Sequence, residues 1–131
     1  MEKDNKNFKV FLVDDDEFLL DMYASKFKMS GFDVEIARNG KEALSKLKEG
    51  LSPDVILLDI VMPEISGFEF LETLKEEKIP MPMVVVLSNL GQKSDIEKGK
   101  KLGASDYIIK ASFTPSEVVQ KVRSLLGGKN I

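Results

Sequence analysis

The sequence contains no cysteine and no histidine among its 131 residues. The absence of cysteine excludes a disulfide framework and a thiolate metal site. The absence of histidine removes the most common general base at neutral pH and the most common zinc ligand. Any metal ion bound by this chain is therefore expected to have oxygen ligands, which favours Mg²⁺, Mn²⁺ or Ca²⁺.

Long apolar runs and a surplus of basic charge are also missing. Apolar runs such as Met83 to Leu87 are far shorter than a membrane span, and residues 1–7 lack the apolar stretch of a secretory signal. We therefore expect a cytoplasmic protein that does not cross a membrane. The net charge of −3 and the isoelectric point near 5.1 argue against direct binding to nucleic acid, which normally requires a clustered basic face.

The length and composition are those of one globular domain. The hydrophobic fraction is 43% and the charged fraction is 31%, and 131 residues suffice for one core but not for two ordinary ones. We predict a single domain over residues 1–131, with a core at about residues 8–127 and flexible ends at 1–7 and 128–131.

Short apolar runs alternate along the chain with segments of helical periodicity. This alternation predicts an α/β fold, in which an open, doubly wound parallel sheet has helices on both faces. Thr114 is expected to cap the last helix, with Pro115 in its first position, and Gly99 weakens the fourth helix by about 1 kcal/mol relative to alanine. The predicted strands are 8–13, 33–37, 55–58, 83–87 and 105–109, and the predicted helices are 17–30, 41–49, 67–78, 95–102 and 115–127.

Polar residues follow four of the predicted strands at the point where each strand ends. Ligands of such sheets bind outside the carboxyl edge. If the strand order is 2-1-3-4-5, neighbouring strands about 4.8 Å apart bring the carboxylates within reach of one ion. Because three such carboxylates need a compensating cation, we predict a Mg²⁺ site with room for a phosphate oxygen. The residues are Asp14 and Asp15, Asp59, Ser88 and Lys110.

Taken one at a time, these residues have ordinary structural explanations. Aspartates after strands often form turns or cap helices, and we adopt that interpretation for Asp16 and Glu17, which are expected to begin the first helix. Lys110 alone would be a solvated surface lysine, and Ser88 alone a turn residue. Their joint position at one edge of the sheet favours a functional site.

Four segments of the chain resemble the signature segments of response-regulator receiver domains, which act in two-component signalling. The resemblance covers nearly the whole chain, in order and at the family's spacing. It implies a flavodoxin-like (βα)5 fold with a five-stranded sheet in the order 2-1-3-4-5. It also implies a phosphorelay switch in place of a turnover enzyme. The segments are residues 11–17, 57–63 with Gly67, 86–88 and 103–110.

The resemblance implies a phosphoryl-transfer role for the acidic residues. Asp59 is similar to the phosphoacceptor, whose donor is a histidine kinase or a phosphotransfer protein. Asp14 and Asp15 match the family's acidic pair, in which Asp15 would bind Mg²⁺ directly and Asp14 would act mainly through water. The backbone carbonyl of Val61 would be a further ligand, and Mn²⁺ could substitute for Mg²⁺.

The resemblance also implies a switch. Lys110 would neutralise the phosphoryl group, Ser88 would receive a phosphoryl oxygen after transfer, and Tyr107 matches an aromatic that turns inward when the serine moves. The face built from the fourth helix, the fifth strand and the fifth helix would then engage an unknown downstream protein. From the residues alone, a partly buried strand aromatic explains Tyr107 equally well. Met62, Pro63 and Gly67 are interpreted as loop geometry only.

Two positions depart from the family's pattern. Asn89 stands where the family usually has alanine or glycine and is expected to crowd the phosphoryl entrance. Ala111 stands where the family usually has proline after a cis peptide bond. Because a cis bond without proline costs about 2.5–4 kcal/mol, we predict a trans bond between Lys110 and Ala111.

Three alternatives remain open at this point. Asp14 and Asp16 also fit the D-x-D start of haloacid-dehalogenase-type phosphohydrolases, although Phe18 stands where that family has threonine or valine and the chain has no room for a cap domain. A flavodoxin-like binding module would need glycines and hydroxyls, not four acids, after the first strand. A scaffold domain that is never phosphorylated is the third alternative.

Overall fold

The computed structural model describes residues 7–128, so most of the predicted flexible ends at 1–7 and 128–131 lies outside the described residues. Gly128, predicted as part of the second flexible end, is instead the last residue of the final helix. Strands and helices alternate along the chain, as the apolar pattern predicts. The elements are β1 (Lys9–Val13), α1 (Glu17–Met29), β2 (Asp33–Ala37), α2 (Gly40–Lys48), β3 (Val55–Leu58), α3 (Gly67–Glu76), β4 (Met83–Ser88), α4 (Lys93–Lys101), β5 (Asp106–Ile109), a short 3₁₀ helix (Lys110–Ser112) and α5 (Pro115–Gly128).

The five strands form one parallel sheet in the order β2-β1-β3-β4-β5, which confirms the predicted topology. The predicted bounds of β2 and β3 coincide with the observed ones, and other ends differ by one or two residues. The largest difference is in α4, predicted at 95–102. It begins at Lys93 because the N–H groups of Asp95 and Ile96 both donate to the Gln92 carbonyl, which closes a turn earlier.

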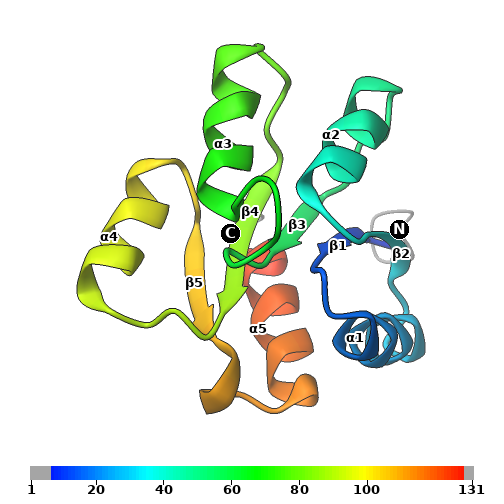
Figure 1. Ribbon diagram of the computed structural model, residues 1–131. Coiled ribbons are helices and arrows are strands. Elements are labelled where there is room, and N and C mark those ends of the chain that lie inside the picture. The colour runs from blue at the N-terminus through cyan, green and yellow to red at the C-terminus, as the bar shows by residue number, and fades with distance from the viewer. Residues whose placement is uncertain (1–6, 129–131) are drawn as a thin grey trace.

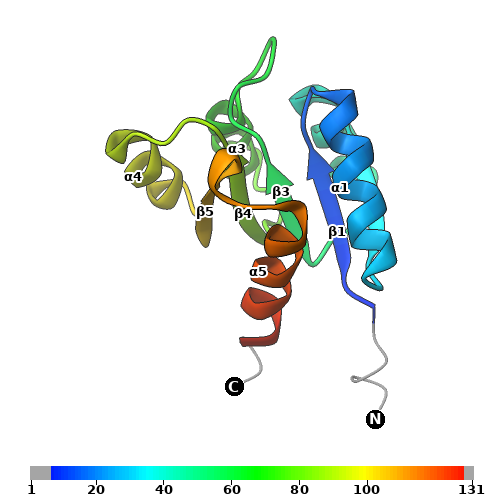
Figure 2. The same ribbon diagram turned by 90° about the horizontal axis from the view of Figure 1, so that it is seen from below.

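Helices cover both faces of the sheet. Figures 1 and 2 show α1 and α5 together on one face, and α2 and α3 on the other. The first layer buries Phe27 of α1 and Val122 of α5, and the second buries Leu47 of α2 and Phe70 of α3. Every residue of β3 is buried, as expected for a central parallel strand. The strand that precedes Asp59 is therefore the most enclosed part of the sheet.

Helix caps set the chain direction beside the carboxyl edge. Asp16 caps α1, with its Oδ1 accepting from the Leu19 N–H at 3.1 Å, and Glu17 is the first helical residue. Thr114 Oγ1 accepts from the Glu117 N–H at 3.1 Å, and the Glu117 carboxylate accepts from the Thr114 N–H at 2.8 Å. The predicted helix starts at Asp16 and Thr114 are therefore confirmed.

Two further predictions concern the backbone and the membrane. Within residues 7–128 every peptide bond is trans, so the predicted trans bond between Lys110 and Ala111 is confirmed. In the same residues, no helix has both the length and the apolar character that crossing a membrane requires.

Candidate functional site

Backbone pairing continues past the strand ends and holds two aspartates side by side. The Asp14 N–H donates to the Ala37 carbonyl at 3.2 Å, and the Asp59 N–H donates to the Val13 carbonyl at 2.9 Å. Asp14, Asp15 and Asp59 each offer a carboxylate oxygen, and these oxygens lie within 4.8 Å of one another. Asp14 and Asp59 are buried, whereas Asp15 is exposed. The predicted acidic cluster therefore exists, with one member open to solvent.

Lys110 supplies a cation to this cluster. Its Nζ lies 2.8 Å from Asp14 Oδ2 and 3.6 Å from Asp59 Oδ2, and all three side chains are largely buried. Burial alone would lower the pKa of Lys110, but the hydrogen bond to Asp14 and the charge of Asp59 outweigh it and raise that pKa. The lysine therefore stays protonated and neutralises part of the acidic charge.

Asp59 is held in a surrounding that disfavours its charge. Burial raises the pKa of Asp59, and the nearby Asp14 carboxylate raises it further. Three contacts oppose this rise in pKa: the charge of Lys110, a hydrogen bond with Ser88, and the Ile60 N–H, which donates to Asp59 Oδ1 at 2.8 Å. Additional positive charge beside Asp59, from a metal ion or from a closer approach of Lys110, would therefore stabilise the ionised carboxylate.

Ser88 ends β4 beside Asp59 and is fully buried. Its Oγ accepts a hydrogen bond from the Leu90 N–H at 3.2 Å. The hydroxyl is thus held by the backbone of the loop between β4 and α4. Any rearrangement of this hydroxyl must release or move the Leu90 backbone.

The carboxyl edge of the sheet is hollowed around these side chains. The hollow has a volume of about 480 Å³, and six of the seven predicted site residues line it. The seventh, Tyr107, lies outside. Val61 lines the hollow with a side chain that is 60% exposed. The lining residues are Asp14, Asp15, Asp16, Leu19, Asp59, Val61, Ser88, Asn89, Leu90 and Lys110.

Tyr107 contacts the same loop from outside the hollow. Its hydroxyl donates to the Leu90 carbonyl at 2.5 Å, and burial raises the pKa of the phenol to about 12, with contributions from Asp95 and Asp59. The ring packs on α4 at Gly99, where an added Cβ would lie 3.1 Å from the ring carbon Cδ2. The contact with Tyr107 explains why a glycine occupies this helical position despite its cost.

Gly67 does more than the loop geometry that the sequence suggested. It is the first residue of α3, and its N–H donates to the Ile60 carbonyl at 2.8 Å. A Cβ at this position would overlap the Asp59 carbonyl oxygen and lie 2.9 Å from Ile60 Cα. The helix therefore packs directly on the backbone that carries the predicted phosphoacceptor.

Two contributions to the site were not predicted. Tyr23 lines a small cavity with Asp14 and Asp59, and burial raises the pKa of this phenol, whereas the charge of Lys110 lowers it. The only signal was a tyrosine within the apolar stripe of the first helix. Asn89 Oδ1 accepts a hydrogen bond from the Ala111 N–H at 3.0 Å. Asn89 and Ala111 are the two positions that depart from the family's pattern, but nothing in the sequence predicts a bond between them.

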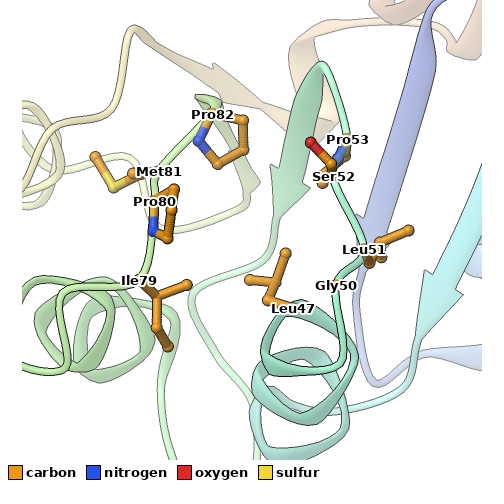
Figure 3. A pocket seen from close by; sticks show the side chains of 9 residues that line it. All are labelled: Leu47, Gly50, Leu51, Ser52, Pro53, Ile79, Pro80, Met81 and Pro82. Atoms are coloured by element: carbon orange, nitrogen blue, oxygen red, sulfur yellow. The ribbon is translucent and has the colours of Figure 1, made fainter.

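A second hollow, of about 450 Å³, lies at the opposite edge of the sheet. Figure 3 shows the side chains that line it, which come from the segments before β3 and β4. None of the nine lining residues is charged, and three are prolines. The titratable groups of the carboxyl edge have no counterpart there.

Comparison with known proteins identifies the family. The response regulator receiver domain family matches residues 10–123. The chain belongs to this family. The receiver domain is 36% identical over 120 residues to the alkaline phosphatase synthesis transcriptional regulatory protein PhoP of Bacillus subtilis, covering 92% of this chain and 49% of that protein. It is 32% identical over 117 residues to the response regulator SaeR of Staphylococcus aureus, covering 89% of this chain and 50% of that protein.

Solved structures agree with this assignment. The receiver domain of the Francisella response regulator 1452 superposes with a TM-score of 0.83 at 33% identity, covering 94% of this chain and 99% of that chain. A CheY-like receiver domain from Methanospirillum hungatei gives 0.84 at 26% identity, covering 95% and 98%. The chain spans about half the length of the curated relatives it matches. The match confirms the predicted receiver fold and assigns the chain to this family, not to the phosphohydrolases.

Proposed function

We propose that this receiver domain accepts a phosphoryl group on Asp59 from a phosphohistidine, in a Mg²⁺-dependent reaction. The donor is a histidine kinase or a phosphotransfer protein. The observation that carries the proposal is a buried carboxylate at the end of the central strand, with two more carboxylates and a lysine around it. The domain transfers one group to itself and loses it slowly, without turning over a substrate.

The donor set fits a hard divalent cation. Three carboxylate oxygens within 4.8 Å of one another suit Mg²⁺, which retains several waters and takes few protein ligands. Asp15, which is exposed, and Asp59 would bind the ion directly, Asp14 would act mainly through water, and the Val61 carbonyl would complete the protein ligands. Mn²⁺ would substitute because it prefers the same oxygen ligands. When bound, the ion supplies positive charge to the transferring phosphoryl group.

The residues of the chain divide the remaining chemistry among them. An oxygen of the Asp59 carboxylate attacks phosphorus in line as the bond from phosphorus to the imidazole nitrogen breaks, and the electron pair stays on the imidazole. The product is an acyl phosphate. Lys110 neutralises charge on the phosphoryl oxygens, and the Ser88 hydroxyl donates to one of them after transfer.

Exposed apolar side chains around the acidic hollow support a protein donor. Phe18 is 79% exposed, Val61 60% and Leu90 36%, and they lie after β1, β3 and β4 respectively. Val61 and Leu90 line the hollow, and Phe18 is the second residue of α1, which begins near it. Apolar side chains gathered near a polar site are typical of a surface that another protein covers.

The loop after β4 connects the site to the face formed by α4, β5 and α5. When the Ser88 hydroxyl turns to a phosphoryl oxygen, its bond with the Leu90 N–H is lost. The Leu90 carbonyl is the acceptor for Tyr107, so movement of the loop changes the tyrosine on β5 and its packing on α4. This face would present the signal to a downstream protein.

Intact-mass spectrometry after incubation with acetyl phosphate tests the proposal. The wild-type chain should gain one phosphoryl group with Mg²⁺ and none with EDTA. Asp59→Asn should gain none, because the amide is not a nucleophile. A chain that stays unmodified with acetyl phosphate and with a phosphohistidine donor would favour the scaffold alternative. A mass gain that persists in Asp59→Asn would refute the assignment of the acceptor.

A further inference from the structure

One hydrogen bond joins the two loops that carry Ser88 and Lys110. Asn89 Oδ1 accepts from the Ala111 N–H at 3.0 Å, across 22 positions of sequence. Ala111 lies in the first turn of the short 3₁₀ helix Lys110–Ser112, where a backbone N–H has no partner within the helix. The Asn89 side chain is therefore the protein acceptor for this N–H.

The two bonded residues directly follow two residues of the site. Asn89 comes after Ser88, and Ala111 comes after Lys110. The side chains of Ser88, Asn89 and Lys110 also line the same hollow. A shift of the Asn89 backbone would therefore also move Ser88, and a shift of Ala111 would also move Lys110.

The loop after β4 is held to the β5 segment at a second point. The Tyr107 hydroxyl donates to the Leu90 carbonyl, while the Leu90 N–H donates to Ser88 Oγ. The Tyr107 bond anchors the loop beside α4. The Asn89 bond anchors it at the turn that directs the Lys110 side chain toward Asp14 and Asp59.

We propose that Asn89 is a positioning residue for Lys110, because its side-chain oxygen holds the Lys110–Ala111 turn against the loop that carries Ser88. The inference rests on the proposed phosphorylation of Asp59. It replaces the expectation that Asn89 merely crowds the entrance to the site, since the amide is engaged with Ala111. Ser88 and Lys110 then approach the phosphoryl group as one unit.

The two roles of Asn89 predict opposite effects. If Asn89 positions Lys110, Asn89→Ala lowers the rate constant for phosphorylation by acetyl phosphate about two- to tenfold, the range for one hydrogen bond of modest net strength. If Asn89 acts by bulk, the same substitution raises the rate. Both residues are exposed, so water can replace the lost partner and the melting temperature should hardly change.

A double-mutant cycle isolates the bond. Ala111→Pro removes the donor N–H, so Asn89→Ala should have little further effect on the rate in that background. Equal effects of Asn89→Ala in both backgrounds, or a rate increase in either, would overturn the inference while leaving the proposed function intact. A wild-type chain that gains no phosphoryl group would instead overturn the proposed function.

Amide hydrogen exchange provides a measurement that does not require Ala111→Pro to fold. The Ala111 amide should exchange faster in Asn89→Ala than in the wild type, whereas Asn89→Asp, which keeps an acceptor oxygen, should preserve its protection. Unchanged exchange in Asn89→Ala would show that the bond does not hold the turn, and the inference would fail.

Discussion

Lys110 Nζ lies 2.8 Å from Asp14 Oδ2, closer than its 3.6 Å separation from Asp59 Oδ2. The lysine is therefore paired mainly with a carboxylate of the acidic pair, and only secondarily with the proposed acceptor. A metal ion held at the acidic cluster would compete with the ammonium for the negative charge of Asp14. Metal binding would thus free the ammonium to move toward a phosphoryl group on Asp59.

Removing this ammonium should strengthen metal binding and weaken phosphorylation. Lys110→Ala leaves three carboxylates without their cation, so we predict Mg²⁺ affinity higher by about 1–2 kcal/mol, roughly tenfold. The phosphorylation rate should fall by roughly 10²-fold, because a group that neutralises the transferring charge is gone. Calorimetric Mg²⁺ titration and intact-mass kinetics measure the two effects.

Lys121→Ala is the matched control for the change in charge. Lys121 pairs with Asp106 at 3.4 Å, and neither residue belongs to the acidic cluster. Its removal should leave Mg²⁺ affinity almost unchanged. An unchanged or weaker Mg²⁺ affinity in Lys110→Ala would contradict competition between the ammonium and the metal.

Mg²⁺ should raise the melting temperature of the wild-type chain. At a concentration tenfold above the dissociation constant, the gain is about 1.4 kcal/mol, a few degrees for a domain of this length. Asp15→Asn should lose most of this shift because Asp15 is the exposed carboxylate of the cluster. Asp21→Asn, at an exposed position of α1 outside the cluster, removes the same charge and should retain the shift. Equal shifts in both variants would argue against the site.

Asp59 should make stability fall as pH rises. Its pKa is raised in the folded state, so the folded chain binds more protons than the unfolded chain between the two pKa values, and stability decreases through that window. In EDTA, Asp59→Asn should therefore be more stable than the wild type at neutral pH, by a few degrees. The difference should shrink toward pH 4, near the ordinary pKa. Melting curves that give a constant difference across this range would contradict the raised pKa.

Gly67→Ala should be strongly destabilising. An added Cβ meets backbone at Asp59 and Ile60, which cannot rotate away, so we predict a loss of about 2 kcal/mol or more. Gly127→Ala, where an added Cβ meets nothing within 4 Å, should instead stabilise α5 by about 0.5–1 kcal/mol. Urea denaturation measures both. If Gly67→Ala lowers the free energy of unfolding by less than about 0.5 kcal/mol, as ordinary surface substitutions do, the backbone around Gly67 relaxes to admit the methyl group and the prediction is wrong.

Much of the fold and the acidic cluster could be predicted because local patterns determine them. Apolar runs end abruptly at Asp14 and Asp59, and a parallel sheet brings such ends to one edge. The trans bond before Ala111 followed from the cost of the alternative. These conclusions need only strand order and the chemistry of the chain.

The remaining features depend on side-chain directions that no local pattern encodes. Lys110 is 96 positions from Asp14 in sequence. Which carboxylate its long side chain pairs with depends on the positions of all the carboxylates in the folded protein. The bond between Asn89 and Ala111 joins the loops after β4 and β5, whose relative position depends on how the sheet packs. The close approach of Gly67 to Asp59 likewise arises from tertiary packing.

Chemical mapping of the acyl phosphate shows directly whether Asp59 is the phosphoacceptor. The wild-type chain is incubated with acetyl phosphate and Mg²⁺, treated with sodium borohydride, which reduces an aspartyl phosphate to homoserine, and digested for peptide mass spectrometry. We expect homoserine at Asp59 and nowhere else, and no homoserine when EDTA replaces Mg²⁺. Homoserine at Asp14 or Asp15, or a phosphoryl group that resists borohydride on a serine or threonine, would contradict it.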